Sequence, residues 1–185
     1  MLTISRREAL IGVAGTGATI LISGWLGSPA WARCRSSQHS DASVTAWVRI
    51  SPDNSLTLIA SQSEMGQGAS TTLALILADE LYVPLTRVRI EFAPFAPVYR
   101  EPIYQWMFTG NSHGMASFYD IMRTMGAAAR EMLLKAAADH LHVPLGELLT
   151  ANGVIHHART KRSVRFTDVA EAAARLPVRS NQTLL

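Results

Sequence analysis

The chain has 185 residues, of which 48% are hydrophobic and 17% are charged, and this is enough for one domain with a hydrophobic core. Its formal net charge of +3 is spread along the chain without a long basic run, so we expect no nucleic-acid-binding surface. Cys34 is the single cysteine, which excludes an internal disulfide and a cysteine-cluster zinc or iron–sulfur centre in this chain.

Residues 1–32 have the pattern of an export signal. Arg6 and Arg7 precede a weakly hydrophobic, uncharged segment, and small residues on both sides of Trp31 form an A-x-A cleavage pattern. This arrangement resembles a twin-arginine signal, which would direct the protein to the periplasm or cell envelope. A retained membrane anchor is the alternative, but five glycines within the segment favour removal of a signal. We expect residues 33–43 to form a polar linker.

Hydrophobic periodicity predicts the elements that follow. Residues 46–50 and 56–60 alternate or run apolar on either side of a Pro-Asp-Asn turn, which is typical of a β-hairpin. From Ser70 the apolar residues recur at helical spacing until Pro84, which ends the predicted helix. A short strand is expected at residues 88–92.

Residues 93–109 carry three prolines together with five aromatic side chains. Because proline interrupts helical hydrogen bonding, this segment is predicted to be an extended loop. Such a loop either covers an edge of the core, or lines a channel or contacts a partner, and the sequence leaves both interpretations open.

A long helix is predicted at 116–140, with apolar residues three and four apart along one face. Its methionines are interpreted as core residues rather than metal ligands, because a thioether metal site needs other soft ligands nearby. A ribbon is expected to pair residues 154–157 with 163–166. Thr167 is then expected to cap a helix at 168–174.

Together these elements predict an α+β fold over residues 44–176, in which a β-hairpin and helices pack on a small mixed sheet with an appended β-ribbon. Residues 177–185 are interpreted as a truncated linker. His156 and His157 are expected to point to opposite faces of their strand, which argues against a shared metal ion, and no metal ligand is assigned.

The stretch 61–72, SQSEMGQGASTT, connects a predicted strand to a predicted helix. Gly66 and Gly68 can adopt positive φ and let a ligand approach the main chain. Gln62 and Gln67 can donate and accept hydrogen bonds at once. The free N–H groups and the dipole at the start of the helix would favour a phosphate group. A simple polar turn is the alternative.

Glu64 is the one acidic residue of this loop. A carboxylate would repel a bound phosphate, so we expect Glu64 to cap backbone amides or to face solvent. A second loop with the same organisation, 109–114, places Gly110, Asn111 and Ser112 before the long helix. Two such loops can hold one extended anionic cofactor from two sides, which favours a binding site over a simple turn.

The order of these motifs resembles the molybdopterin-binding large subunit of the aldehyde oxidase/xanthine dehydrogenase (molybdenum hydroxylase) family, and in particular the isoquinoline 1-oxidoreductase beta-subunit type. The resemblance rests on Glu64-Met65-Gly66-Gln67-Gly68, on the helix that ends before Pro84, and on Thr109-Gly110-Asn111-Ser112 before an alanine-rich helix. It implies that a molybdopterin cytosine dinucleotide contacts Gln62, Gly66, Gln67, Gly68, Gly110, Asn111 and Ser112. It also implies a separate small [2Fe-2S] subunit, in agreement with the absent cysteine cluster.

The resemblance implies an oxidoreductase that hydroxylates an aldehyde or an N-heterocycle with water-derived oxygen. Two features depart from the family. Asn111 stands where relatives often have glycine, and the large subunit is several times longer, with its catalytic glutamate far toward its C-terminus. No catalytic residue is therefore assigned, and the chain is expected to be an N-terminal fragment that is inactive without the rest of the large subunit. An exported binding or interaction domain without chemistry, or a degenerate fragment, is the alternative function.

Overall fold

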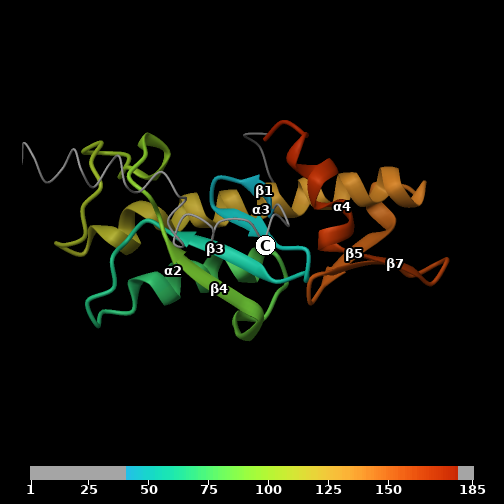
Figure 1. Cartoon of the computed structure of the whole chain (residues 1–185), viewed down its shortest axis with the longest axis horizontal. Coiled ribbons are helices and arrows are strands. Elements are labelled where there is room, and N and C mark those ends of the chain that lie inside the picture. The colour runs from blue at the N-terminus through green and yellow to red at the C-terminus, as the bar shows by residue number, and fades with distance from the viewer. Residues whose placement is uncertain (1–40, 179–185) are drawn as a thin grey trace, which may run out of the picture. The chain divides into compact units, whose positions relative to one another are not determined.

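The computed structural model describes residues 41–178 (Figure 1). The predicted signal, 1–32, lies outside the described residues. Within the described range, no helix is long and apolar enough to cross a membrane. The main elements in chain order are β1 Ala42–Thr45, β2 Val48–Ile50, β3 Leu56–Ala60, α2 Ala69–Glu80, β4 Val88–Phe92, α3 His113–Leu141, β5 Leu148–Ala151, β6 Val154–His157, β7 Arg162–Arg165 and α4 Phe166–Ala174.

The first sheet has the strand order β1-β2-β3-β4 and is mixed, as predicted. β2 and β3 form the predicted antiparallel hairpin. β3 and β4 are parallel, with Leu56 opposite Val88 and Ala60 opposite Phe92, so both strands end at the same edge of the sheet. The helix α2 lies in the crossover connection that a parallel pair requires.

The helices α2 and α3 pack against each other at very short range (Figure 1). A Cβ atom on Gly126 would lie 2.8 Å from the Cβ of Glu80 and 3.0 Å from the carbonyl oxygen of Leu77, so only glycine fits here without a shift. Beside this contact, the buried carboxylate of Glu80 accepts hydrogen bonds from Arg123 Nε (2.9 Å) and Arg130 Nη1 (3.0 Å). The end of α2 is thereby tied to the middle of α3.

The second sheet is the predicted ribbon with one further strand, in the antiparallel order β5-β6-β7. α4 follows β7 directly and packs against β1 and α3 (Figure 1). His156 is exposed and His157 is completely buried, which confirms that the two side chains point to opposite faces of β6.

Two predicted boundaries differ from the structure. β1 begins at Ala42, inside the predicted linker 33–43, because its short Ala-Ser-Val-Thr sequence carries too little alternation to indicate a strand. The predicted cap at Thr167 is wrong, because α4 begins one residue before it. Asp168 instead accepts a hydrogen bond from the backbone N–H of Arg165 (3.1 Å), which completes a capping box.

The segment 93–109 is a loop with a single short 3₁₀ turn at Pro97–Tyr99, as its prolines predict. Tyr99 packs edge-on against the buried Trp47, with ring centroids 4.9 Å apart. The buried carboxylate of Glu101 accepts hydrogen bonds from two backbone N–H groups of the loop and from Ser117 Oγ (2.6 Å). This carboxylate therefore fastens the loop to α3.

Candidate cofactor-binding site

The loop before α2 is folded around the carboxylate of Glu64. Glu64 Oε1 accepts hydrogen bonds from the backbone N–H groups of Gly66 and Gly68, each at 2.9 Å. Glu64 Oε2 accepts from Ser70 Oγ at 2.7 Å and from the Ser70 N–H at 3.3 Å. Hydrogen bonds from the Ser70 hydroxyl and the Gly68 amide lower the pKa of Glu64 to about 2. The expectation that Glu64 caps backbone amides is confirmed.

This capping corrects one part of the sequence interpretation. The N–H groups at the start of α2 were expected to favour a phosphate, but those of Gly66, Gly68 and Ser70 already donate to a negatively charged carboxylate. That carboxylate also compensates the positive end of the α2 dipole. A ligand phosphate at this helix start would meet a charge of its own sign.

Gln67 closes the same loop through its side-chain amide. Its Oε1 accepts a hydrogen bond from the Met65 N–H (2.6 Å), and its Nε2 donates to the Ser63 carbonyl oxygen (2.7 Å). One amide hydrogen and one oxygen lone pair of Gln67 remain for a ligand.

The glycines of this loop are required by its backbone conformation. Gly66 has φ +92° and Gly68 has φ +74°, a region that side chains with a Cβ rarely adopt. No atom lies within 4 Å of a Cβ placed on either residue, so both glycines face open space. Their predicted role, close approach of a ligand to the main chain, is compatible with this space.

The loop before α3, unlike the loop before α2, provides no side chain that caps its helix. Asn111 and Ser112 both have positive φ, 50° and 57°, and Ser112 occupies the N-cap position without a side-chain cap hydrogen bond. The first turn of α3 carries no acidic residue. The His113 N–H donates to the Gly110 carbonyl oxygen (3.1 Å), and Ser112 caps none of the other N–H groups of the first turn, so these groups and the positive dipole end of this 29-residue helix can face an anion.

Gly110 has a local reason to be glycine. A Cβ on Gly110 would lie 2.6 Å from the Phe108 ring, so the absent side chain leaves room for this ring to pack on the main chain. The sequence interpretation of Gly110 as a ligand contact did not foresee this internal packing, since the position of the ring depends on the fold of the preceding loop.

The two loops meet, and the Ser63 N–H donates to Thr109 Oγ1 (2.9 Å) between them. Beside this hydrogen bond lies a cavity of about 400 Å³, named here the interloop cavity. Residues from both loops and from the starts of both helices line it, among them Gln62, Gln67, Gly110, Asn111, Ser112 and Met115. The structure thus brings most of the predicted cofactor contacts into one cavity. Gly66 and Gly68 lie on the first loop but are not part of this lining.

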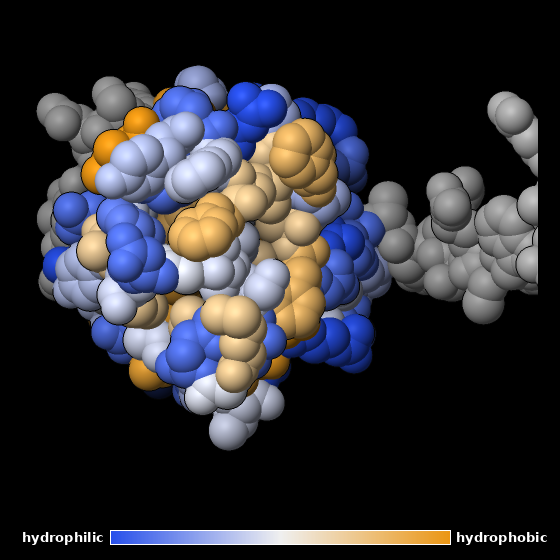
Figure 2. Space-filling model, turned by 90° about the vertical axis from the view of Figure 1, so that its left-hand side faces the viewer, coloured by the Kyte–Doolittle hydropathy of each residue, from blue (hydrophilic) through white to orange (hydrophobic). Residues whose placement is uncertain are grey.

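A second cavity, of about 340 Å³, adjoins the first and is named here the strand-end cavity. It lies where β3 and β4 end, and its lining includes Ser61, Gln62, Phe92, Met107 and Phe108. The two cavities have Gln62, Met65 and Thr109 in common. The loops before α2 and α3 lie at the end of the domain that faces the viewer in Figure 2, where apolar residues gather around a hollowed centre.

Two polar side chains of the strand-end cavity lack an internal partner. Ser61 is 8% exposed and Gln62 is 2% exposed, and neither Ser61 Oγ nor Gln62 Oε1 has a hydrogen-bond partner in the described part of the chain. Buried polar atoms without partners are rare in folded proteins, so such atoms indicate a polar ligand or an ordered water. The sequence interpretation named Gln62 for its chemistry and missed Ser61, although a polar pair directly after a buried strand was a usable signal.

A larger cavity, of about 630 Å³, lies along the second half of α3 and is bordered by Met132, Leu145 and Leu176. None of the buried polar side-chain atoms that lack a partner between residues 41 and 178 belongs to its lining. This cavity is larger than the other two, but the buried polar atoms that need partners border the two smaller cavities. We therefore take the two smaller cavities as the candidate binding site.

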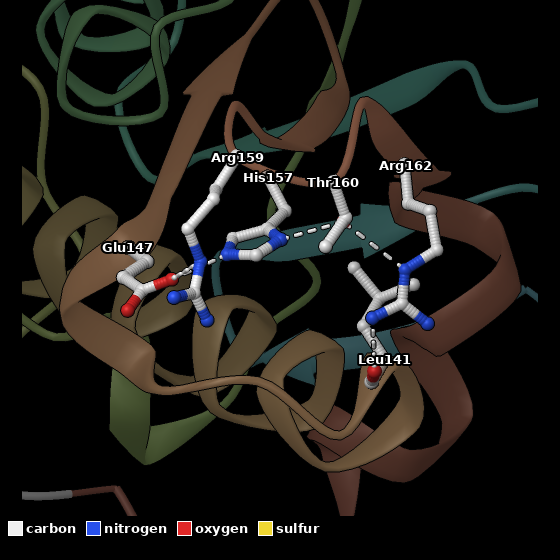
Figure 3. Close-up of polar contacts among 6 residues, drawn as sticks. All are labelled: Leu141, Glu147, His157, Arg159, Thr160 and Arg162. Atoms are coloured by element: carbon white, nitrogen blue, oxygen red, sulfur yellow. Dashed lines mark hydrogen bonds and ion pairs between the residues drawn. The ribbon is translucent and has the colours of Figure 1, made fainter.

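The polar cluster around His157 has a structural role (Figure 3). Arg162 Nε donates to Thr160 Oγ1 (3.2 Å), so the Thr160 hydroxyl can donate its proton to His157 Nδ1 (2.7 Å). His157 Nε2 then carries the proton that is shared with Glu147 Oε2 (2.6 Å). Both ring nitrogens are engaged. The described part of the chain contains no group of three or more His, Cys, Asp or Glu residues placed to hold a metal ion.

The residues around the two smaller cavities fit a cofactor that has both polar and anionic groups. The buried atoms Ser61 Oγ and Gln62 Oε1 need hydrogen-bond partners, and the uncapped start of α3 favours negative charge. The residues therefore suit the kind of cofactor that the sequence implied.

Comparison with known proteins places the chain in a family. It matches the model of the molybdopterin cofactor-binding domain over residues 5–184. It is 34% identical over 137 residues to isoquinoline 1-oxidoreductase subunit beta of Brevundimonas diminuta, a match that covers 73% of this chain and 17% of that protein. It is 30% identical over 125 residues to the membrane-bound aldehyde dehydrogenase (pyrroloquinoline-quinone) of Gluconacetobacter polyoxogenes, covering 68% of this chain and 15% of that protein.

Among solved structures, quinoline 2-oxidoreductase from Pseudomonas putida 86 is similar, with a TM-score of 0.46 and 26% identity over 70% of this chain and 16% of that chain. The chain belongs to the molybdopterin cofactor-binding domain family, within the large subunits of the molybdenum hydroxylases. The particular relationship is to the isoquinoline 1-oxidoreductase beta-subunit type, which confirms the resemblance found in the sequence. The chain spans 17% and 15% of the length of the two curated relatives.

Proposed function

We propose that this chain supplies cofactor-binding loops to a molybdenum hydroxylase and that the cofactor is a molybdopterin cytosine dinucleotide. The observation that carries the proposal is the convergence of two loops on one cavity, lined by Gln62, Gln67, Gly110, Asn111 and Ser112. Membership of the molybdopterin cofactor-binding family supports it.

The start of α3 would hold an anionic group of the cofactor. Its N–H groups have no capping side chain, and Asn111 and Ser112 border the cavity directly before them. Gln67 would add the amide hydrogen and the lone pair that its loop leaves free, while Gly66 and Gly68 would keep the first loop clear of side chains.

When bound, a molybdenum cofactor supplies the oxygen-transfer and electron-accepting chemistry of hydroxylation. The proposed substrate is an aldehyde or an N-heterocycle. The residues of this chain bind and orient, and none of them is assigned a catalytic role.

The proposed partners are the remainder of a large subunit and a small [2Fe-2S] subunit. The loop 93–109 supports contact with another protein surface, because several of its apolar side chains are solvent-exposed, with Phe95 at 80% and Trp106 at 53%. The rings of Tyr104, Trp106 and Phe108 lie in tilted contact, with consecutive ring centroids 5.7 and 5.2 Å apart. The same surface would serve the second candidate function, an exported interaction domain without chemistry.

The proposed location is the periplasm or cell envelope, reached by the twin-arginine route. The paired Arg6 and Arg7 support it. Replacement of both by lysine should leave the full chain in the cytoplasm, as shown by cell fractionation, and unchanged export would contradict this route.

The binding proposal is tested by the cofactor content of the purified full chain. Expression in a host that makes the cytosine dinucleotide form should yield bound molybdenum and, after denaturation, a cytidine nucleotide. Chain from a host that cannot make the cofactor is the control. Gln67→Leu should reduce retention about tenfold, as expected for loss of a ligand hydrogen bond, whereas Gln105→Leu outside the two cavities should not. Equal molybdenum and nucleotide in both hosts would refute the proposal.

A further inference from the structure

Glu101 is a buried acidic residue that the proposed binding site does not use. It is 2% exposed and borders neither the interloop cavity nor the strand-end cavity. Its Oε2 accepts hydrogen bonds from the backbone N–H groups of Ile103 (2.9 Å) and Tyr104 (2.6 Å), and its Oε1 accepts from Ser117 Oγ (2.6 Å). A buried carboxylate is costly unless its oxygens are hydrogen-bonded, so these bonds fix the side chain in one position.

The main chain of Glu101 closes a turn over residues 101–106. The Glu101 N–H donates to the Trp106 carbonyl oxygen (2.8 Å), and the Gln105 N–H donates to the Glu101 carbonyl oxygen (2.9 Å). Backbone and side chain of one residue therefore hold the turn together. The bond to Ser117 fixes this turn to the second turn of α3.

A series of aromatic contacts leads from this turn to the loop before α3. The Tyr104 ring lies 5.3 Å from the ring of His113, the first residue of α3, and 5.7 Å from the Trp106 ring. The Trp106 ring lies 5.2 Å from that of Phe108, which packs on the main chain of Gly110. Closely packed groups transmit displacements, so a shift of the turn would move Gly110, which borders the interloop cavity.

We propose that Glu101 is a positioning residue of the cofactor site. Its hydrogen bonds hold the turn 101–106 against α3, and the turn holds the loop 109–112 where that loop can contact the cofactor. This inference rests on the proposed function, because the loop is taken to bind the cofactor. Among the described residues, Glu101 accepts no hydrogen bond from the N–H groups at the start of α3, so these groups stay free for the ligand.

The role requires the hydrogen bonds of Glu101 rather than its charge, and two substitutions separate these properties. Glu101→Gln keeps an oxygen that can accept from both loop N–H groups, and its amide N–H can donate to Ser117 Oγ. Glu101→Leu has similar bulk but leaves two N–H groups and a hydroxyl without their acceptor, which loosens the turn. The glutamine variant should therefore behave as the wild type does, and the leucine variant should not.

The first measurement is amide hydrogen exchange by mass spectrometry on the full chain without cofactor. Glu101→Leu should speed exchange over residues 101–113 about tenfold, as for the net loss of one hydrogen bond from the local opening equilibrium. Glu101→Gln should exchange as the wild type does. Residues 148–165, which form the second sheet, are the internal control, and their exchange should stay unchanged in both variants.

The second measurement is the molybdenum and cytidine nucleotide retained by the full chain from a cofactor-producing host. Glu101→Leu should lower retention about tenfold, and Glu101→Gln should retain the wild-type amount. Gln105→Leu is a control in the same turn, because it removes only the side-chain bond to the Pro102 carbonyl oxygen (2.7 Å). Val164→Ala is a control for stability, because it truncates a buried residue of β7. Both controls should retain cofactor as the wild type does.

A double-mutant cycle tests the connection to α3. Ser117→Ala removes one of the three hydrogen bonds and should speed exchange over residues 101–113 less than Glu101→Leu does. The double variant should exchange as Glu101→Leu alone does, because the bond between the two side chains is already lost. Fully additive effects would contradict a shared contact.

Three results would overturn the proposal. These are unchanged exchange in Glu101→Leu, retention as low in Glu101→Gln as in Glu101→Leu, which would assign the role to the charge, and retention as low in Val164→Ala, which would reduce the role to overall stability. The proposed function fails separately. A wild-type chain that retains no molybdenum would refute the cofactor assignment, while exchange over residues 101–113 would still decide whether Glu101 positions the loop.

Discussion

The loops that precede α2 and α3 look alike in the sequence and differ in their electrostatics. Both are polar, contain glycine and lead into a helix, but the N–H groups at the start of α2 donate to Glu64, while α3 begins at Ser112 without a capping side chain. A glycine-containing loop before a helix therefore does not by itself indicate an anion site. The carboxylate that lies nearest to the first helical turn decides whether the dipole is already compensated.

The largest effect is expected from making the second loop resemble the first. Asn111→Asp places a carboxylate beside the start of α3, which no side chain of the N-cap residue caps, where it should repel an anionic cofactor group and reduce cofactor retention by more than about tenfold. Retention is measured as molybdenum and nucleotide bound to the purified chain. Asn152→Asp is the matched control, because Asn152 also has positive φ and lies in neither small cavity. Equal retention in both variants would contradict the assignment of the anion to α3.

A smaller effect is expected from replacing a glycine with positive φ in the loop before α2. Gly68→Val forces a β-branched residue into φ +74°, which should lower the free energy of unfolding by about 2 kcal/mol, although no atom lies within 4 Å of the added Cβ. Gly68→Asn should cost less, because asparagine adopts this conformation more readily. Urea denaturation of the two variants measures the difference. Equal destabilisation by valine and asparagine would show that steric contact rather than backbone conformation is responsible.

The smallest effect concerns the pH dependence of the first loop. The pKa of Glu64 is lowered to about 2, so its stabilising hydrogen bonds as a carboxylate are fully present above pH 4.5 and are lost as the pH falls toward 2. Wild type should therefore be more stable than Glu64→Gln at pH 6, and this difference should shrink as the pH is lowered. Thermal melts of both proteins at pH 6 and pH 3 measure it. A difference that does not change with pH would contradict the role of the charge.

Local features of the sequence predicted much of the fold. The hairpin of β2 and β3, the helix that ends before Pro84 and the capping role of Glu64 all depend on residues close together in the chain. The buried contact between Glu80 and Arg130 joins residues 50 positions apart, so a local pattern cannot predict it. Pairing of β3 with β4, which brings Ser61 close to Phe92, is likewise set by tertiary packing rather than by local pattern.

The same limit applies to the site. The residue types of Gln62, Gln67, Asn111 and Ser112 indicated hydrogen bonding to a ligand, and the structure places them around one cavity. Residue type did not indicate that the side-chain amide of Gln67 hydrogen-bonds to the backbone of its own loop. It also did not indicate that Gln62 is buried without a partner for its oxygen. Both depend on side-chain orientation, which a motif does not encode.

The close contact at Gly126 influences the spacing between the loops that precede α2 and α3. Each of these loops leads into its helix, and the two helices are held together where Gly126 of α3 meets the end of α2 near Glu80. An added methyl group there would push α2 and α3 apart at this contact. The loops that precede the two helices would then separate or tilt relative to each other. Gly126 borders neither cavity, yet a larger residue at this position is expected to change the width of the interloop cavity.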